Sequence, residues 1–128
     1  MIRISETWVY LSGPISGRSP AEAKAHFSNA ETLVRWSCPK YCYVSNPTNL
    51  PEGWTWNDYM RAGIRELLIC DAILMLDGWE NSKGALIEKD LAEKLGVKVY
   101  YESELREALD KPWIRESNEH SKEQQEKK

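Results

Sequence analysis

Short apolar runs alternate along the chain with longer segments in which apolar residues recur every three or four positions. Four runs have the length and the β-branched, aromatic or aliphatic composition of strands: residues 7–11, 41–45, 72–76 and 97–101. The segments with helical periodicity follow them in order: residues 20–36, 56–69, from 82 or 83 to 95, and 103–109. This alternation predicts an α/β fold with an open parallel sheet and right-handed crossovers.

Residues at the ends of these segments support the same elements. Ser19 and Pro20 suit the N-cap and the first position of the first helix, and Gly96 suits the end of the third. The run 72–76 is continuously apolar, which is typical of a central parallel strand that is buried on both faces.

Three loops leave the carboxyl ends of the predicted strands: residues 12–18, 46–54 and 77–83. Open α/β sheets bind ligands beyond the carboxyl ends of their strands, where the strand order reverses. We therefore expect the polar residues of the three loops to converge on one crevice.

Length and charge limit the possible functions. The 128 residues fit one domain, expected over residues 1–114, and a disordered charged tail over residues 115–128, which hold no strongly apolar residue. A net charge of −3 gives no general attraction for nucleic acid. No apolar run is long enough for a membrane span, and the first residues lack the features of a signal peptide, so we expect a cytoplasmic protein.

The three cysteines, Cys38, Cys42 and Cys70, are an odd number in a chain without an export signal. They are expected to be buried or half-buried thiols and not a disulfide framework. No second pair of ligands at zinc spacing accompanies them, so we expect neither a metal site nor a cofactor.

The start of the third predicted helix offers a candidate anion site. Gly84 lies where free backbone N–H groups and the helix dipole favour an anion, and Ser82 and Lys83 add a hydroxyl and a positive charge. The spacing is not that of a Walker A loop. The alternative is an ordinary strand-to-helix turn in which Ser82 is the N-cap.

Glu88 follows in the same helix, among three apolar residues: Leu86, Ile87 and Leu91. A carboxylate beside an apolar wall can act as a nucleophile or as an acid–base group. The alternative is a solvated cluster with the charged residues that follow it.

Five motifs carry a resemblance to a known family: residues 9–17 (VYLSGPISG), 46–47 (NP), 56–61 (WNDYMR), 70–72 (CDA) and 78–85 (GWENSKGA) with Glu88. In this order they resemble the nucleoside 2-deoxyribosyltransferase superfamily over about residues 7–101. They look most like a bacterial and phage branch close to the nucleoside 5′-monophosphate N-glycosidases. The resemblance implies a flavodoxin-like open parallel sheet of four to five strands with helices on both faces.

The resemblance also implies a nucleophile and a substrate site. Glu88 matches the glutamate that attacks the sugar C1′ and expels the base, and Tyr10 matches a tyrosine that lies near it. Water would then make the enzyme a hydrolase, and a second base would make it a transferase. The residues expected to bind the substrate lie in the loops and at the helix starts: Ser12, Gly13, Pro14, Ile15, Ser16, Gly17, Asn46, Trp56, Trp79, Ser82, Lys83 and Gly84.

Ser82 indicates which substrate the site would take. It stands six residues before Glu88, where the enzymes that act on free nucleosides carry an aspartate. A carboxylate there would repel a phosphate, whereas a hydroxyl and helix N–H groups would bind it. The resemblance therefore favours (deoxy)nucleoside 5′-monophosphates over nucleosides.

Gly63 departs from the family pattern. An aspartate that helps to protonate the leaving base is expected at this position. Asp58 and Asp77 are the candidate replacements, although Asp58 is also expected simply as a charge at a helix N-terminus. The alternative is a catalytically weak or inactive nucleotide-binding module on the same fold; a third, blander reading is an interaction protein without a ligand.

Tryptophans are frequent near the predicted site. Trp54, Trp56 and Trp79 lie on or beside its loops, where an indole face can stack on a base. The alternative is that they cap the core or fill a subunit interface. By analogy with the superfamily, we expect a homodimer or a larger homo-oligomer.

Overall fold

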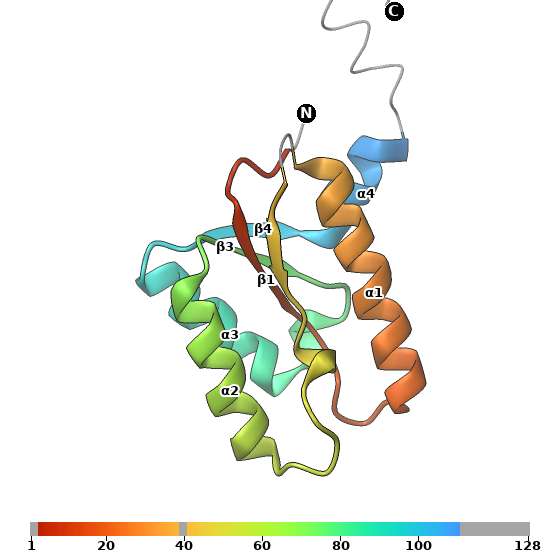
Figure 1. The fold of residues 1–128 in the computed structure, drawn as a ribbon, viewed down its shortest axis with the longest axis vertical. Helices are drawn as coiled ribbons and strands as arrows, with labels where there is room; N and C mark the ends of the chain where they lie inside the picture. Colours follow the sequence, from red (N-terminus) through yellow and green to blue (C-terminus); the bar gives the residue numbers. More distant parts are fainter. Residues whose placement is uncertain (1–2, 39–40, 111–128) are drawn as a thin grey trace, which may run out of the picture.

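A computed structural model describes residues 3–38 and 41–110 of the chain. Strands and α-helices alternate from the N-terminal side to the C-terminal side, as Figure 1 shows. The elements are β1 (Trp8–Ser12), α1 (Pro20–Ser37), β2 (Tyr43–Ser45), α2 (Trp56–Ile69), β3 (Ala72–Met75), α3 (Lys83–Lys94), β4 (Lys98–Tyr101) and α4 (Glu102–Asp110). Two short 3₁₀ turns, η1 (Pro47–Asn49) and η2 (Trp79–Asn81), lie between them.

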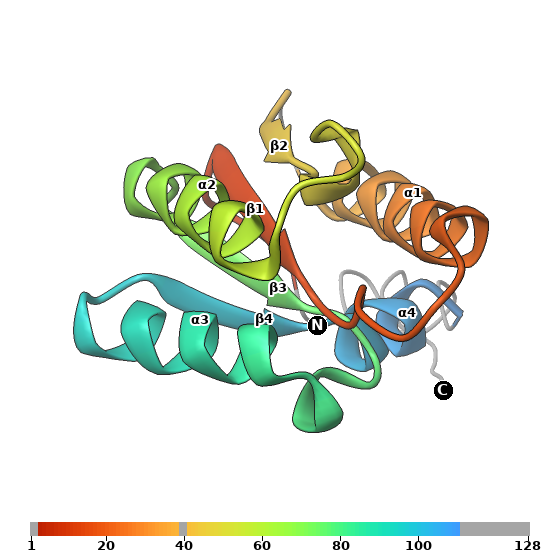
Figure 2. The same cartoon turned by 90° about the horizontal axis from the view of Figure 1, so that it is seen from below.

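The four described strands form one parallel sheet in the order β2-β1-β3-β4. Helices α1 and α4 cover one face, and α2 and α3 cover the other (Figure 2). The sheet confirms the predicted flavodoxin-like α/β fold. The chain leaves β1 toward β2 and then returns to β3 on the other side of β1, so the strand order reverses between β1 and β3.

Side-chain alternation along the strands divides the core into two layers. Val9 and Leu11 of β1 pack with Leu74 of β3 toward α1 and α4. Tyr10 and the alternate residues of β3 pack toward α2 and α3. Every residue of β3 is buried, which confirms the prediction of a central strand covered on both faces.

The predicted start of α1 and the predicted glycine after α3 are confirmed. Ser19 caps α1, and its hydroxyl accepts a hydrogen bond from the Glu22 N–H in a capping box. After α3, Gly96 has a φ of +77°, and the N–H of Val97 donates to the Ala92 carbonyl. This is the Schellman arrangement that favours glycine at the end of a helix.

One strand is shorter than the sequence predicts. The second strand begins at Tyr43 instead of residue 41 and has three residues.

Among the described residues, no helix is both long enough and apolar enough to cross a membrane. The predicted end of the domain at residue 114 and the predicted tail at 115–128 lie outside the described residues.

Candidate active site

A buried carboxylate lies at the reversal of strand order. The Glu88 side chain projects from α3 toward β1, and only 6% of the residue is exposed. The Tyr10 hydroxyl donates a hydrogen bond to Oε2 at 2.7 Å, and the Ser12 hydroxyl donates one to Oε1 at 2.6 Å. Tyr10 and Ser12 are two positions apart on β1, so both side chains point to the same face of the sheet. The solvated charge cluster considered for Glu88 is therefore wrong.

The phase of α3 explains why Glu88 is buried. Ala85, Glu88 and Ala92 are its buried residues and form one helical face toward the sheet. Leu86 and Ile87, which the sequence suggested as an apolar wall beside Glu88, are instead 45% and 39% exposed. The small alanines let the helix approach β1 closely enough for the carboxylate to reach it.

Burial and hydrogen bonding act on the carboxylate in opposite directions. Burial raises the pKa of Glu88, and the hydrogen bonds from Ser12 and Tyr10 lower it by less. The pKa of Tyr10 lies well above its usual value because of burial and then because of the negative charge on Glu88, so the phenol keeps its proton and remains a donor. Among the ion pairs of the described residues, none includes Glu88.

Gly63 on α2 faces this group directly. A Cβ built on Gly63 would lie 2.9 Å from Glu88 Oε2 and still closer to the Tyr10 hydroxyl oxygen. The position at which the resemblance led us to expect an acid therefore has no room for a side chain while Tyr10 and Glu88 hold their places. Gly84 on α3 lies similarly close to α2, since a Cβ added to Gly84 would lie 2.9 Å from Met60 Sδ on that helix.

The two candidate replacement acids are engaged elsewhere. Asp58 is part of the capping box of α2, in which its carboxylate accepts from the Thr55 N–H and its own N–H donates to the Thr55 hydroxyl. Asp77 forms an ion pair with Arg106 of α4, with 2.8 Å between Asp77 Oδ2 and Arg106 Nη2. Neither carboxylate is hydrogen-bonded to the group of Tyr10, Ser12 and Glu88.

The predicted anion site lies at the start of α3. Ser82 is the N-cap, and its hydroxyl accepts from the Ala85 N–H at 3.2 Å. Lys83 Nζ lies 4.6 Å from the centre of the Trp56 ring at the start of α2. The structure therefore brings Trp56 and Lys83 together, and it gives Ser82 the capping role considered as the alternative.

Two of the three predicted loops meet. A Cβ on Gly78, which has a φ of +91°, would lie 3.2 Å from Pro14 Cγ, so the turn after β3 packs against the loop after β1. Gly13 is required by the close approach of Leu76, whose Cβ would lie 2.7 Å from an added Cβ. Beyond these contacts, Ile15, Ser16 and Gly17 are exposed.

Asn46 and Trp79 make structural contacts. Asn46 caps η1 through Thr48 and donates from Nδ2 to Glu31 at 3.3 Å. The Trp79 ring packs on Tyr101, with 5.8 Å between ring centres, and lies under Lys89 Nζ at 5.2 Å. These contacts agree with the alternative that the tryptophan caps the core.

The sequence did not reveal a second buried carboxylate at Glu102, which is 5% exposed. Its Oε1 accepts from the Asp77 N–H at 2.8 Å and lies 2.9 Å from His26 Nε2. Arg18 Nη1 contacts His26 Nδ1 at 3.1 Å and also donates to the Pro14 carbonyl at 2.9 Å. This network links both site loops to α1 and α4, and no sequence motif indicates it.

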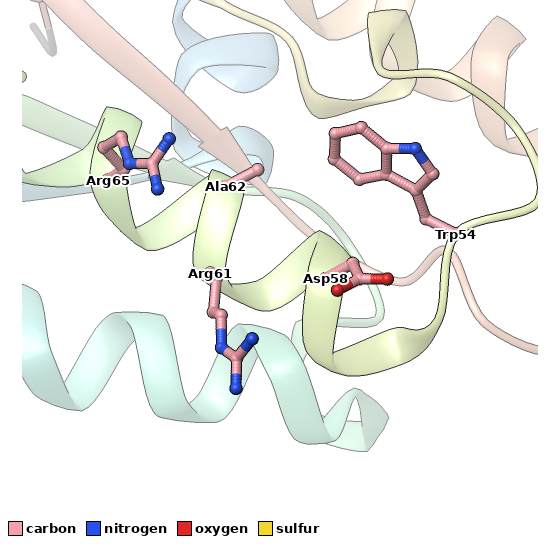
Figure 3. A pocket seen from close by; sticks show the side chains of 5 residues that line it. All are labelled: Trp54, Asp58, Arg61, Ala62 and Arg65. Carbon is pink, nitrogen blue, oxygen red and sulfur yellow. The ribbon is translucent and has the colours of Figure 1, made fainter.

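A hollow of about 310 Å³ lies along α2 rather than over Glu88. Figure 3 shows its lining: Trp54, Asp58, Arg61, Ala62 and Arg65. Arg61 and Arg65 each stand two positions from Gly63, which is about 200° around a helix, so they project from the side opposite Glu88. A second hollow of about 560 Å³ shares both arginines and runs toward Leu68.

The described residues contain no group of three or more His, Cys, Asp or Glu side chains that is suited to a metal ion. The thiols of Cys38 and Cys42 lie 2.9 Å apart, and burial raises the pKa of Cys38 to about 12. Both thiols are free in the structure.

Comparison with known proteins yields a family without an assigned activity. No curated protein and no solved structure matches the chain. A family model described as "Domain of unknown function (DUF4406)" matches residues 7–101. Because this match covers well over half of the chain, the protein belongs to the DUF4406 family.

Proposed function

We propose that the protein is an N-glycosidase that cleaves the base–sugar bond of (deoxy)nucleoside 5′-monophosphates through Glu88, or a transferase that moves the sugar to a second base. One observation carries the proposal: a buried carboxylate, held by two hydroxyl donors, lies where the strand order reverses. A buried charge without a cationic partner destabilises a fold, so its presence favours a role in function. The resemblance of the motifs to the deoxyribosyltransferase superfamily supports the same chemistry.

In the proposed reaction, a Glu88 oxygen forms a bond to the sugar C1′ while the bond from C1′ to the base nitrogen breaks. The transition state resembles an oxocarbenium ion, which the carboxylate stabilises before the bond forms. The Tyr10 and Ser12 hydroxyls, each donating to one carboxylate oxygen, would orient the nucleophile. Water or a second base then attacks C1′ and frees the carboxylate.

The start of α3 supports a phosphate on the substrate. Lys83 contributes a positive charge, and the first turn of a helix presents backbone N–H groups that favour an anion. Since α2 covers Glu88 at Gly63, the substrate would enter from the two loops that meet at Pro14 and Gly78.

The test is release of free base. The protein would be incubated with ribo- and deoxyribonucleoside 5′-monophosphates and with the matching nucleosides, and the products separated by chromatography. Base released from a monophosphate, lost in Glu88→Gln and retained in the control Glu80→Gln, would support the proposal. Glu80 is a suitable control because it is exposed in η2. Preference for nucleosides would contradict the phosphate site.

The close packing at Gly63 favours one second candidate, a nucleotide-binding module without catalysis, because the expected acid has no room there. Equilibrium dialysis separates the two functions. Recovery of intact nucleotide after tight binding would favour the module, whereas recovery of base and sugar phosphate would favour the enzyme.

We also propose a cytoplasmic location, where nucleoside monophosphates are available, and a homodimer or larger assembly. Exposed apolar side chains on α2, with Leu68 and Ile69 each 55% exposed, offer an area for a subunit contact. Light scattering of the purified chain would test the assembly, and a monomer at micromolar concentration would exclude it.

A further inference from the structure

The part of α2 that faces the Glu88 carboxylate is the backbone at Gly63, which carries no acidic side chain. The backbone at Gly63 lies so close that an added Cβ would stand 2.9 Å from Glu88 Oε2. A carboxylic acid at position 63 would therefore displace the Tyr10 hydroxyl and Glu88 instead of reaching a leaving base. Position 63 must therefore be glycine to leave room for the Tyr10 and Glu88 side chains.

Three carboxylates on or near α2 and the turn after β3 are hydrogen-bonded or ion-paired to other groups. Asp58 accepts from a backbone N–H at the start of α2, and Asp77 pairs with Arg106. Glu66, one turn beyond Gly63, accepts from the hydroxyls of Tyr43 and Ser45, each at 3.1 Å. These contacts hold the three side chains away from the group of Tyr10, Ser12 and Glu88.

The two hydroxyl groups at the site already donate hydrogen bonds to Glu88. Tyr10 and Ser12 both point their protons at Glu88, one to each carboxylate oxygen. Burial and the adjacent negative charge raise the pKa of Tyr10 well above its usual value, which makes the phenol a weak acid. Neither group is placed to protonate a base on the far side of C1′.

A neutral purine or pyrimidine leaves C1′ as an anion unless it is protonated, and general acids contribute about 10²- to 10⁴-fold to such steps. A base that already carries a positive charge on the glycosidic ring system needs no proton. When its bond to C1′ breaks, the electron pair moves to the ring nitrogen and neutralises the charge. The leaving group is then a stable neutral molecule.

Charge at the site favours the same class of ligand. Glu88 is buried and has no ion pair in the described structure, so a cationic base beside it would supply the missing countercharge.

We propose, on the basis of the glycosidase function above, that the substrates are nucleoside 5′-monophosphates whose base is a cation, either a pyridinium or an N-alkylated purine. Glu88 displaces the neutral base and forms an ester at C1′. Water then adds to C1′, the ester bond breaks, and one proton passes to solvent. The products are the neutral base, the sugar 5-phosphate and H⁺.

A pair of substrates that differ by one methyl group tests the inference. The full chain is incubated with guanosine 5′-monophosphate, 7-methylguanosine 5′-monophosphate and nicotinamide mononucleotide, and base release is measured against enzyme-free controls. We expect kcat/KM for both cationic substrates to exceed that for guanosine 5′-monophosphate at least 100-fold, after each rate is divided by its uncatalysed rate. The activity should be lost in Glu88→Gln.

The outcomes separate this inference from the proposed function. Release of neutral bases within tenfold of the cationic ones, with loss in Glu88→Gln, would overturn the inference and leave the glycosidase proposal standing. No release from any of the substrates would overturn both. A second readout is the pH profile with nicotinamide mononucleotide: kcat/KM should rise to a plateau, and a fall above neutral pH from a required acid would contradict the inference.

Discussion

If Glu88 acts as proposed, stability and function make opposite demands on this residue. Its carboxyl group is buried and faces two hydroxyl groups instead of a cation. The desolvation of a carboxylate is offset only in part by two neutral donors. A neutral side chain of the same shape would suit the fold better, and this conflict can be measured.

We expect Glu88→Gln to leave the free energy of unfolding at pH 7 unchanged or to raise it by about 1 kcal/mol, because the amide removes the buried charge and can still bond both hydroxyls. Urea unfolding would measure the change, with the exposed Glu80→Gln as the control. A loss of stability larger than about 1 kcal/mol would indicate that the charge itself holds the structure together.

The pH dependence follows from the direction of the shift. The pKa of Glu88 in the folded protein lies above its ordinary value of 4.5, so the folded state binds this proton more tightly than the unfolded state. The contribution of this group to stability is fully present below the unfolded value and is lost as pH rises through the folded value. Unfolding of the native protein and of Glu88→Gln at several pH values should therefore show the variant gaining stability relative to the native protein as pH rises above 4.5. A constant difference would contradict the raised pKa.

At the scale of elements, two glycines set how closely α2 and α3 approach. Gly63 faces Tyr10 and Glu88, which are fixed by the sheet and by hydrogen bonds, whereas Gly84 faces the flexible end of Met60. The same added methyl group should therefore have different consequences at the two positions.

Gly63→Ala should lower the free energy of unfolding by about 1–3 kcal/mol, although alanine is favoured over glycine in a helix by about 1 kcal/mol. Gly84→Ala should be neutral within about 1 kcal/mol because the Met60 side chain can move. Thermal and urea unfolding of both variants give the comparison. Stabilisation by Gly63→Ala would show that the space beside Glu88 is not required.

The end of α3 supplies a second prediction at this scale. Gly96 has a φ of +77°, a conformation that costs most residues about 1–2 kcal/mol. Gly96→Ala should reduce stability by about that amount, and Gly96→Asn should reduce it less because asparagine tolerates this conformation. Equal effects of the two substitutions on the urea midpoint would contradict the reading.

At the scale of the whole molecule, the buried Glu102 joins parts of the chain that are distant in sequence. It binds the backbone of the turn after β3 and, through His26 and Arg18, reaches the loop after β1. The two loops that border the candidate site are therefore tied to the face of the sheet opposite Glu88. We expect the rigidity of the site to depend on this network.

Glu102→Leu should lower the free energy of unfolding by about 1–3 kcal/mol, because it leaves the Asp77 N–H and His26 without their partner. The exposed Glu104→Leu on the same helix is the matched control. Amide hydrogen exchange should show faster exchange in residues 13–18 and 77–82 of the Glu102 variant only. Unchanged exchange there would mean that the network does not hold the loops.

Hydrophobic periodicity and capping residues were enough to predict the elements and their order. Hydrophobic periodicity reflects only nearby residues, and the capping residues Ser19 and Gly96 act within one helical turn. Both signals can therefore be recognised in the sequence without knowledge of the tertiary fold. The parallel sheet followed from the alternation of these elements. The resemblance of the motifs placed Tyr10 near Glu88, and the structure joins them by a hydrogen bond across 78 positions of sequence.

The buried face of α3 could not be predicted from the sequence, because packing against the sheet encloses Glu88 and leaves Leu86 and Ile87 exposed. The fold also pairs Asp77 with Arg106. It places Gly63 where a side chain would have no room beside Tyr10 and Glu88. These outcomes depend on how closely distant backbones approach and on which charges find a partner across the sheet. Local propensity does not carry that information, because a polar side chain takes its protonation and its role from neighbours that folding brings to it.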